Sequence, residues 1–123
     1  YMSLANLPEP KPESIIYEDD KLYVCLARFP ITKGHIVIVW KDDKEDIHLL
    51  ERVDYLYLMD KVEEFRDKQL EILGVEKVYL LYMDEAKQVH WHLIPRYNEE
   101  GFNVFSHNPQ EETDYSLVNK FTS

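Results

Sequence analysis

The sequence predicts an α+β protein in which a five-stranded, mainly antiparallel sheet carries one long helix (and a short one) on one face. Two observations support this. Five short apolar or alternating segments have the spacing of strands, and one long amphipathic segment separates the third from the fourth. The resulting order is β-β-β-α-β-β. Short links between consecutive strands favour antiparallel pairing.

The 123 residues are enough for a single core. We expect an extended N-terminal arm over residues 1–14, which carries Pro8, Pro10 and Pro12 and has no apolar period. Residues 15–97 form the predicted domain. Residues 98–123 form a C-terminal tail, whose scattered apolar residues predict packing on the domain or on a dimer partner.

The first two predicted strands form a hairpin. Residues 15–18 are mostly apolar, Asp19-Asp20 is typical of a tight turn, and residues 21–27 alternate. The third strand is predicted at residues 35–40, where β-branched residues indicate a central strand covered on both faces.

The most helical segment is predicted from about Asp46 to Leu73, with a separate short helix near residues 47–50 as an alternative start. Apolar residues recur there at the helical period, and charged residues lie between them. Asp43 or Asp46 can cap its beginning, and Gly74 can cap its end.

Two strands are predicted after the helix, at residues 75–82 and 88–94. Polar and apolar residues alternate strictly from Gln88 to Leu93, so Gln88, His90 and His92 share one face. Pro95 should end regular pairing, because proline has no amide to donate.

His90 and His92 are close enough to reach one ligand, since residues i and i+2 of a strand lie about 6–7 Å apart on the same side. Three interpretations are open. One imidazole can attack phosphorus while the other donates a hydrogen. The pair can also bind a metal, with His35 or Glu99 as further ligands, or it can be a structural hydrogen-bonded pair.

Charge and cysteine content narrow the functional classes. The net charge of −10 argues against nucleic acid or an anionic membrane as partner. The single cysteine, Cys25, can form no intrachain disulfide, which favours a reducing cytoplasmic setting, and its apolar surroundings predict a buried thiol.

Two separated motifs resemble those of the histidine-triad (HIT) family. The first is Gly34-His35 opening an apolar strand, and the second is Gln88-Val89-His90-Trp91-His92-Leu93-Ile94-Pro95-Arg96 after the long helix. The family pattern there is H-x-H-x-H followed by apolar residues and often by P-R. The resemblance spans residues 15–97. It implies that the α+β sheet predicted from residue spacing has a HIT-like fold.

The resemblance implies a nucleotide-binding hydrolase or nucleotidyl transferase with no cofactor. His90 matches the nucleophile that attacks the α-phosphate, and His92 matches the histidine that assists the leaving group. His35 matches the supporting histidine. Gln88 replaces the first histidine, and Lys87 and Arg96, with Lys33, are nearby cations that can hold phosphate.

Four positions depart from the family pattern: Gln88, Ala27, Val78 and Glu85. Gln88 still offers a backbone carbonyl to orient the next histidine. Ala27 stands where a residue that holds the ribose hydroxyls is expected, and it can make no such bond. Val78 and Glu85 fall where an asparagine and a short hydroxyl residue are expected.

The sequence therefore supports an enzyme acting through His90, with two alternatives: a non-catalytic ligand-binding relative, and an H-x-H metal protein. The expected partner is a small nucleotide or nucleoside phosphate. The family also implies a homodimer, and four apolar residues beyond one helix face fit a second contact: Tyr55, Leu56, Tyr57 and Met59.

Overall fold

The structure, a computed structural model, describes residues 7–83, 86–97 and 110–122. Five strands and two α-helices occupy this part of the chain, together with short 3₁₀ helices at Pro12–Ser14 and Ile47–Leu49. The elements are β1 (Ile15–Glu18), β2 (Leu22–Leu26), β3 (Ile36–Trp40), α1 (Arg52–Leu73), β4 (Lys77–Tyr82), β5 (His90–Arg96) and α2 (Val118–Phe121).

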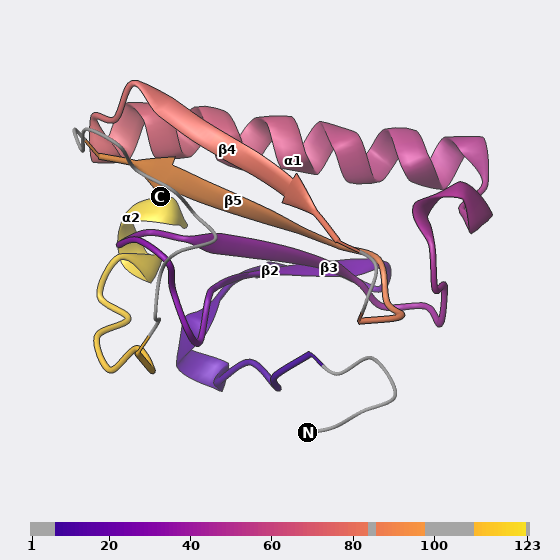
Figure 1. Cartoon of the computed structure of the whole chain (residues 1–123), viewed down its shortest axis with the longest axis horizontal. Helices are drawn as coiled ribbons and strands as arrows, with labels where there is room; N and C mark the ends of the chain where they lie inside the picture. Colours follow the sequence, from indigo (N-terminus) through magenta and orange to yellow (C-terminus); the bar gives the residue numbers. More distant parts are fainter. Residues whose placement is uncertain (1–6, 84–85, 98–109, 123) are drawn as a thin grey trace.

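The strands form one sheet in the order β1-β2-β3-β5-β4, and each neighbouring pair is antiparallel. β5 lies between β3 and β4, so the strand that carries the histidines has a neighbour on each side. Figure 1 shows α1 along one face of this sheet and the N-terminal segment beyond the other face. The predicted α+β architecture is confirmed.

The long helix begins later than the sequence predicts. Asp46 does cap a helix, because its side chain accepts a hydrogen bond from the His48 amide, but that helix is the 3₁₀ helix Ile47–Leu49, which is the short helix expected near residues 47–50. Leu50 then adopts an extended conformation and is 9% exposed. Placing Leu50 in the core separates the two helices, and α1 starts at Arg52. It ends as predicted at Gly74, whose φ of 67° is in the left-handed region.

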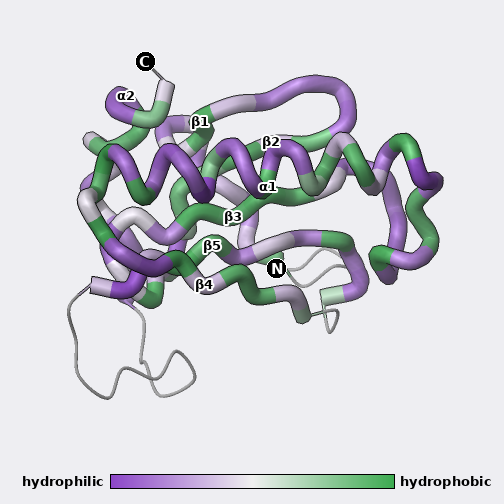
Figure 2. Tube along the Cα trace, turned by 90° about the horizontal axis from the view of Figure 1, so that it is seen from above, coloured by the Kyte–Doolittle hydropathy of each residue, from purple (hydrophilic) through white to green (hydrophobic). Residues whose placement is uncertain are grey.

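The hydrophobic core lies between α1 and the sheet. Seen from above in Figure 2, α1 runs across the sheet, and its residues alternate between hydrophobic and hydrophilic. Fully buried core side chains on the helix and the strands beneath it include Leu22, Ile36, Ile38, Trp40, Leu58, Phe65 and Leu93. Tyr55, Tyr57 and Met59 pack against this core, so of the four surplus apolar residues only Leu56 is exposed.

β5 starts two residues after Gln88 and continues through Pro95, which corrects the prediction that pairing ends at that proline. β3 pairs with β5 only as far as Ile36 opposite Leu93. Among the described strands, Pro95 has β4 as its neighbour, through Val78. The proline therefore lies just beyond the last β3 pair, where its missing amide is at the end of the β3 ladder and not inside it.

The described terminal segments both pack on the sheet region. Ser14 closes the Pro12–Ser14 turn by donating to the Lys11 carbonyl at 2.7 Å. At the other end Phe121 is fully buried in the core, and Lys68 of α1 donates to its carbonyl at 3.1 Å. No helix in the described part of the chain is long and apolar enough to cross a membrane.

Candidate active site: three histidines on the open face of the sheet

The alternation of β5 places the histidines on the face away from α1. Val89 and Leu93 are fully buried in the core, and Trp91 packs against it. His90, which is 3% exposed, and half-buried His92 therefore point to the opposite face. This placement of the two predicted catalytic residues follows from a period of two residues.

His35 joins them from the loop before β3. Its Nε2 lies 2.9 Å from Nδ1 of His92, and the two ring centroids are 5.1 Å apart. The centroids of His90 and His92 are 5.0 Å apart. Three imidazoles thus form one continuous row, which brings together residues from two motifs that are far apart in the sequence.

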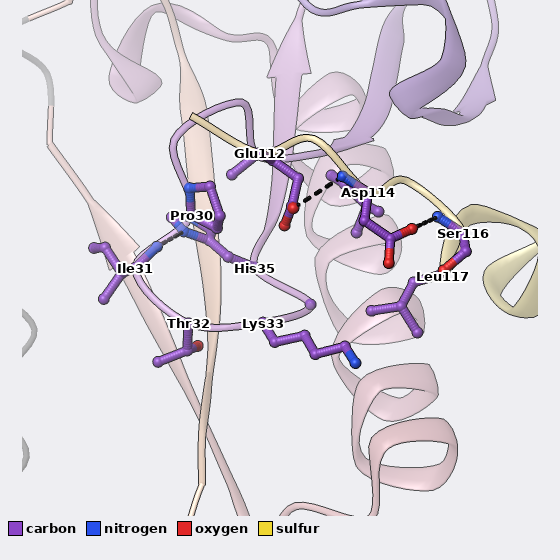
Figure 3. A pocket seen from close by; sticks show the side chains of 12 residues that line it. Pro30, Ile31, Thr32, Lys33, His35, Glu112, Asp114, Ser116 and Leu117 are labelled. Atoms are coloured by element: carbon purple, nitrogen blue, oxygen red, sulfur yellow. Dashed lines mark hydrogen bonds between the residues drawn. The ribbon is translucent and has the colours of Figure 1, made fainter. Parts of the chain in front are cut away.

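Backbone contacts fix where His35 and His92 carry their hydrogens. The Ile31 amide donates to Nδ1 of His35 at 3.0 Å, as Figure 3 shows, so that nitrogen must accept. A neutral His35 then carries its hydrogen on Nε2 and donates it to Nδ1 of His92. His92 in turn carries its own hydrogen on Nε2, the nitrogen that can donate to a ligand.

His90 has the opposite arrangement. Its Nδ1 lies 2.8 Å from the Gln88 carbonyl, which can only accept, so Nδ1 carries the hydrogen. The lone pair of a neutral His90 is therefore on Nε2. Gln88 is held by its side chain, which donates to the Trp40 carbonyl at 2.9 Å. The backbone carbonyl at position 88 thus orients His90 although the residue is no histidine.

Burial keeps the two supporting imidazoles neutral. Burial lowers the pKa of His35 from 6.5 to about 3, with a further contribution from His92. Burial and the neighbouring His90 lower the pKa of His92 from 6.5 to about 4. At pH 7 both rings are therefore uncharged, and His92 acts as a hydrogen-bond donor with no additional proton to release.

A small cavity of about 160 Å³ lies directly against His35 and His92. Its floor comes from the histidine face of β2 and β3, with Cys25, Val37 and Val39. Burial raises the pKa of the Cys25 thiol to about 12, so this side chain is an apolar lining group. Leu7, Pro8 and Pro10 of the N-terminal segment form part of the wall.

A wider hollow of about 660 Å³ continues under the same N-terminal residues toward Gln88. Tyr23 lines both spaces, and it lies beside Val39, which pairs with His90. The wider hollow is also lined by Lys41, whose Nζ is 2.7 Å from the Glu18 carboxylate. The open face therefore offers a small apolar space next to a larger polar one.

Several residues expected in the site lie elsewhere. Arg96 is at the far end of β5, in a hollow with Gly74–Glu76 and Tyr97 that includes none of the histidines. Val78, which falls where the family has an asparagine, packs against the core on the α1 face. Lys87 is exposed, with φ at 58° in the turn before Gln88. Glu85 lies outside the described residues.

The structure also shows site residues that the sequence did not reveal. Arg28 donates through Nε to Glu111 at 2.9 Å and through Nη1 to the Glu9 carbonyl at 3.2 Å, which joins the two terminal segments at the rim of the small cavity. Ile31 sets the tautomer of His35 through a backbone amide. Neither contact has a local sequence signal, because each depends on the path of a loop.

The C-terminal segment closes the outer side of the loop that carries His35. Figure 3 shows this segment facing the loop, with Asp114 and Lys33 on opposite sides of a cavity of about 360 Å³. The Ser116 backbone and side chain, together with Lys33, hold the pKa of Asp114 below its usual value. Ala27, 5% exposed, lies between this cavity and the one beside His92.

The described residues contain no group of three or more histidine, cysteine, aspartate or glutamate side chains that could hold a metal ion. Both ring nitrogens of His35 are occupied, Nδ1 by the Ile31 amide and Nε2 by His92, so His35 has no nitrogen left to bind a metal. The geometry suits chemistry by the imidazoles themselves.

An open antiparallel sheet with one long helix behind it, and with three histidines in a row on its other face, defines a class of small α+β proteins. Residues 9–99 match the family model of the HIT domain. The chain belongs to the HIT family.

Known relatives agree with this assignment. An uncharacterized 13.1 kDa HIT-like protein encoded in the P37 5' region of Mesomycoplasma hyorhinis is 34% identical over 95 residues, which cover 72% of this chain and 86% of that protein. A Hit-like protein involved in cell-cycle regulation from Bartonella henselae has a similar fold, with a TM-score of 0.76 at 16% identity over 91% of this chain and 86% of that one.

A third relative has a named activity. The fold of Plasmodium falciparum diadenosine triphosphate hydrolase matches with a TM-score of 0.67 at 15% identity, over 91% of this chain and 76% of that one. At this identity the likeness concerns the fold.

Proposed function

We propose that this protein is a hydrolase or nucleotidyl transferase that acts on nucleoside phosphates through a nucleotidyl intermediate on His90. The observation that carries the proposal is the pair of opposite tautomers. His90 presents a lone pair on Nε2, and His92 presents a hydrogen on Nε2, with the ring centroids 5.0 Å apart. A nucleophile beside a donor is the arrangement that displacement at phosphorus requires.

In the first step, Nε2 of His90 attacks the α-phosphorus. The P–N bond to His90 forms as the bond from phosphorus to the leaving oxygen breaks, and the electron pair leaves with that oxygen; in a phosphoramidate the leaving atom is a nitrogen, which takes up a proton from solvent as it departs. His92 donates a hydrogen bond to the departing oxygen and stabilises its negative charge. His90 becomes cationic, and the hydrogen bond from its Nδ1 to the Gln88 carbonyl, 2.8 Å in the uncharged ring, strengthens accordingly.

In the second step, water or another acceptor attacks the same phosphorus. The P–N bond breaks, its electron pair returns to Nε2 of His90, and the proton of the acceptor passes to solvent. Splitting the displacement in this way replaces one difficult step with two easier ones. The scheme uses only side chains and the acceptor, and it requires no cofactor.

The cavities support a nucleoside phosphate as substrate. The apolar space of about 160 Å³ beside His92 suits part of a nucleoside, and the wider polar hollow beside Gln88 suits the phosphate chain or leaving group. Dinucleoside polyphosphates and nucleoside phosphoramidates both offer an α-phosphorus with a leaving group. The diadenosine triphosphate hydrolase fold relative favours including the former in any substrate panel.

Turnover of such a panel by wild type, His90→Ala and His48→Ala tests this proposal. His48 is an exposed histidine of the 3₁₀ helix Ile47–Leu49, with 73% of its side chain accessible, and it serves as the matched control. We expect wild type and His48→Ala to turn over the same substrates and His90→Ala to lose activity. Equal rates in wild type and His90→Ala would contradict the proposal.

Ala27 favours a second candidate, a ligand-binding protein without turnover. Its methyl group lines the small cavity and offers no hydrogen bond to a sugar. Thermal unfolding with AMP, GMP or their polyphosphates tests this candidate, because a ligand at a hundred times its dissociation constant adds about 2.7 kcal/mol of stability. Stabilisation without turnover supports it, and turnover by wild type excludes it.

We also propose that the protein works as a homodimer. β4 is an edge strand of the sheet, and Leu80 on it is 42% exposed, as is 49% of Leu56 on α1. An edge strand of the described sheet that carries exposed apolar residues favours association with a second copy. Light scattering after gel filtration tests this, with twice the mass of one chain as the expected result. A single-chain mass would contradict it.

A further inference from the structure

Gln69 is a fully buried polar residue of α1, on the opposite side of the sheet from the histidines. Its Nε2 donates to two backbone carbonyls, Gly34 O and Leu93 O, each at 2.9 Å. Gly34 directly precedes His35, and Leu93 directly follows His92. One side chain thus ties together the two backbone segments that carry the bonded pair of imidazoles.

The position of Gln69 compensates for Pro95. The last pair between β3 and β5 joins Ile36 to Leu93, and the same register continued by two residues would place Gly34 opposite Pro95. Proline has no amide, so it can give no ladder hydrogen bond to the Gly34 carbonyl. Gln69 supplies that donor from α1, while Thr32 donates to the Pro95 carbonyl at 2.6 Å.

Leu73, one helical turn after Gln69, also packs against Gly34. Gly34 has a φ of +85°, and a Cβ added there would lie 2.6 Å from Cδ1 of Leu73. Gln69 and Leu73 are four residues apart on α1, so they face the same loop. The end of the helix therefore holds Gly34 both by a hydrogen bond and by close packing.

The amide oxygen of Gln69 differs from its nitrogen in hydrogen bonding. Within the described residues, buried Oε1 has no hydrogen-bond partner. A buried unpaired oxygen opposes folding, whereas an apolar side chain of equal size would bury no such atom. The benefit of a glutamine at this position therefore comes from its two donated hydrogen bonds.

We propose that Gln69 is a positioning residue of the active site. By holding Gly34 and Leu93 together it keeps Nε2 of His35 within 2.9 Å of Nδ1 of His92, and so keeps the hydrogen of His92 on Nε2. The kinetic consequence rests on the proposed function, but the effect on the two imidazoles does not. His90 is oriented separately by Gln88 and should be unaffected.

The test replaces Gln69 with methionine, which keeps the length of the side chain and removes both donors. Long-range proton–nitrogen NMR spectra of the ligand-free protein report the tautomer of each histidine. We expect wild type to show single tautomers for all three, and Gln69→Met to show mixed tautomers for His35 and His92 with His90 unchanged. Wild-type patterns for His35 and His92 in the variant would overturn the proposal.

Kinetics provide the second measurement. A misplaced donor lowers the rate of the chemical step by about 10- to 100-fold, so kcat should fall in that range while KM changes less than about twofold. Val62→Ala is the control for destabilised α1 packing, since Val62 is 1% exposed on the same helix. An equal loss of kcat in Val62→Ala would contradict the positioning role. If wild type has no turnover, the proposed function fails while the NMR test still decides this inference.

Restoring the missing amide provides a rescue. Pro95→Ala returns an N–H to the position opposite Gly34, so the double variant Gln69→Met/Pro95→Ala should recover single tautomers for His35 and His92. This variant also serves if Gln69→Met alone does not fold, with Pro95→Ala as its reference. Tautomers still mixed in the folded double variant would show that a donor to Gly34 does not hold the pair.

Discussion

The two faces of the sheet are built from alternate residues of the same strands, yet substitutions on them should have different effects. On the α1 face, Ile36, Ile38 and Leu93 are fully buried among apolar side chains, and stability depends on how closely they pack. On the other face, His92 lines the small cavity and His90 lies buried beside it, and their hydrogen-bond partners include a backbone carbonyl and another imidazole.

Alternate residues of β5 face opposite sides of the sheet, so the side that a residue faces determines whether its substitution changes stability or activity. Leu93 and His92 are neighbours in the sequence, but one contributes apolar burial and the other a hydrogen on a defined nitrogen. Gln69 is the exception, because it reaches the backbone of the histidine segments from the packed face. Substitutions on either face can therefore separate activity from stability.

The largest expected effect is on the histidine face. His90→Ala should lower turnover by about 10⁴-fold, equivalent to about 5.4 kcal/mol at 1.36 kcal/mol per tenfold, because it removes the nucleophile. Denaturant unfolding should show a much smaller change in stability. If His90→Ala loses as much free energy of unfolding as of transition-state stabilisation, the claim that this face determines activity and not stability is wrong.

The matching substitution on the packed face is Leu93→Ala. It removes a fully buried side chain and should lower the free energy of unfolding by about 3 kcal/mol, within the usual range for such cavities. The folded fraction should keep the kcat of wild type, measured below the unfolding transition. Loss of kcat in the folded protein would show that the two faces are coupled at this position.

Acid should weaken the protein through the histidine face. His35 and His92, with pKa values of about 3 and about 4, stay neutral in the folded state, whereas in the unfolded chain they take up protons near pH 6.5. The unfolded state therefore gains protons first, so stability is complete above about pH 6.5 and falls as pH decreases toward 4. Between pH 7 and pH 5.5 the two residues together should cost about 2 kcal/mol.

Replacing both residues provides the control for this pH effect. A His35→Phe/His92→Phe variant should show a flatter dependence of its free energy of unfolding on pH over the same interval. An unchanged slope would show that other groups control the acid response.

The smallest effect concerns a polar contact at the edge of the packed face. Asp19 closes the β1–β2 turn by accepting from the Lys21 and Leu22 amides, and Tyr57 of α1 also donates to it. Burial raises the pKa of Asp19, but the hydrogen bonds from Tyr57, the two amides and Tyr17 outweigh it and hold that pKa below its usual value.

Tyr57→Phe should therefore cost about 1 kcal/mol in urea unfolding, with kcat unchanged. The expected effect is small because only the contacts of one hydroxyl, to Asp19 and to the Tyr17 hydroxyl, are lost while the ring and its packing remain. A change in kcat would contradict the assignment of this cluster to stability.

Most of the fold could be predicted from the sequence, because strand and helix periods are local signals. The five strands, the single long helix and its end at Gly74 follow from residue spacing alone. The start of α1 could not be predicted, since it depends on Leu50 entering the core in an extended conformation. The extension of β5 through Pro95 depends on where β3 ends.

The histidines of the site could also be predicted from the sequence, but the backbone contacts that orient them could not. Alternation placed His90 and His92 on one face, and the Gly34-His35 motif suggested a third imidazole, which the structure brings to 2.9 Å from His92. The resemblance matched Val78 to an asparagine of the family, but which face Val78 occupies depends on strand pairing, which places it on the α1 face. The role of Ile31 could not be predicted because it depends on the path of the loop before His35, and that of Gln69 because its backbone partners are far away in the sequence.

Trapping the covalent intermediate tests the central claim most directly. Wild type and His90→Ala are mixed with a dinucleoside polyphosphate or a nucleoside phosphoramidate, quenched at early times in alkali to preserve the P–N bond, and digested for mass spectrometry. The account predicts one nucleotidyl group on the wild-type peptide that contains His90, and none in His90→Ala. Turnover without this adduct, or an adduct on another residue, would contradict it.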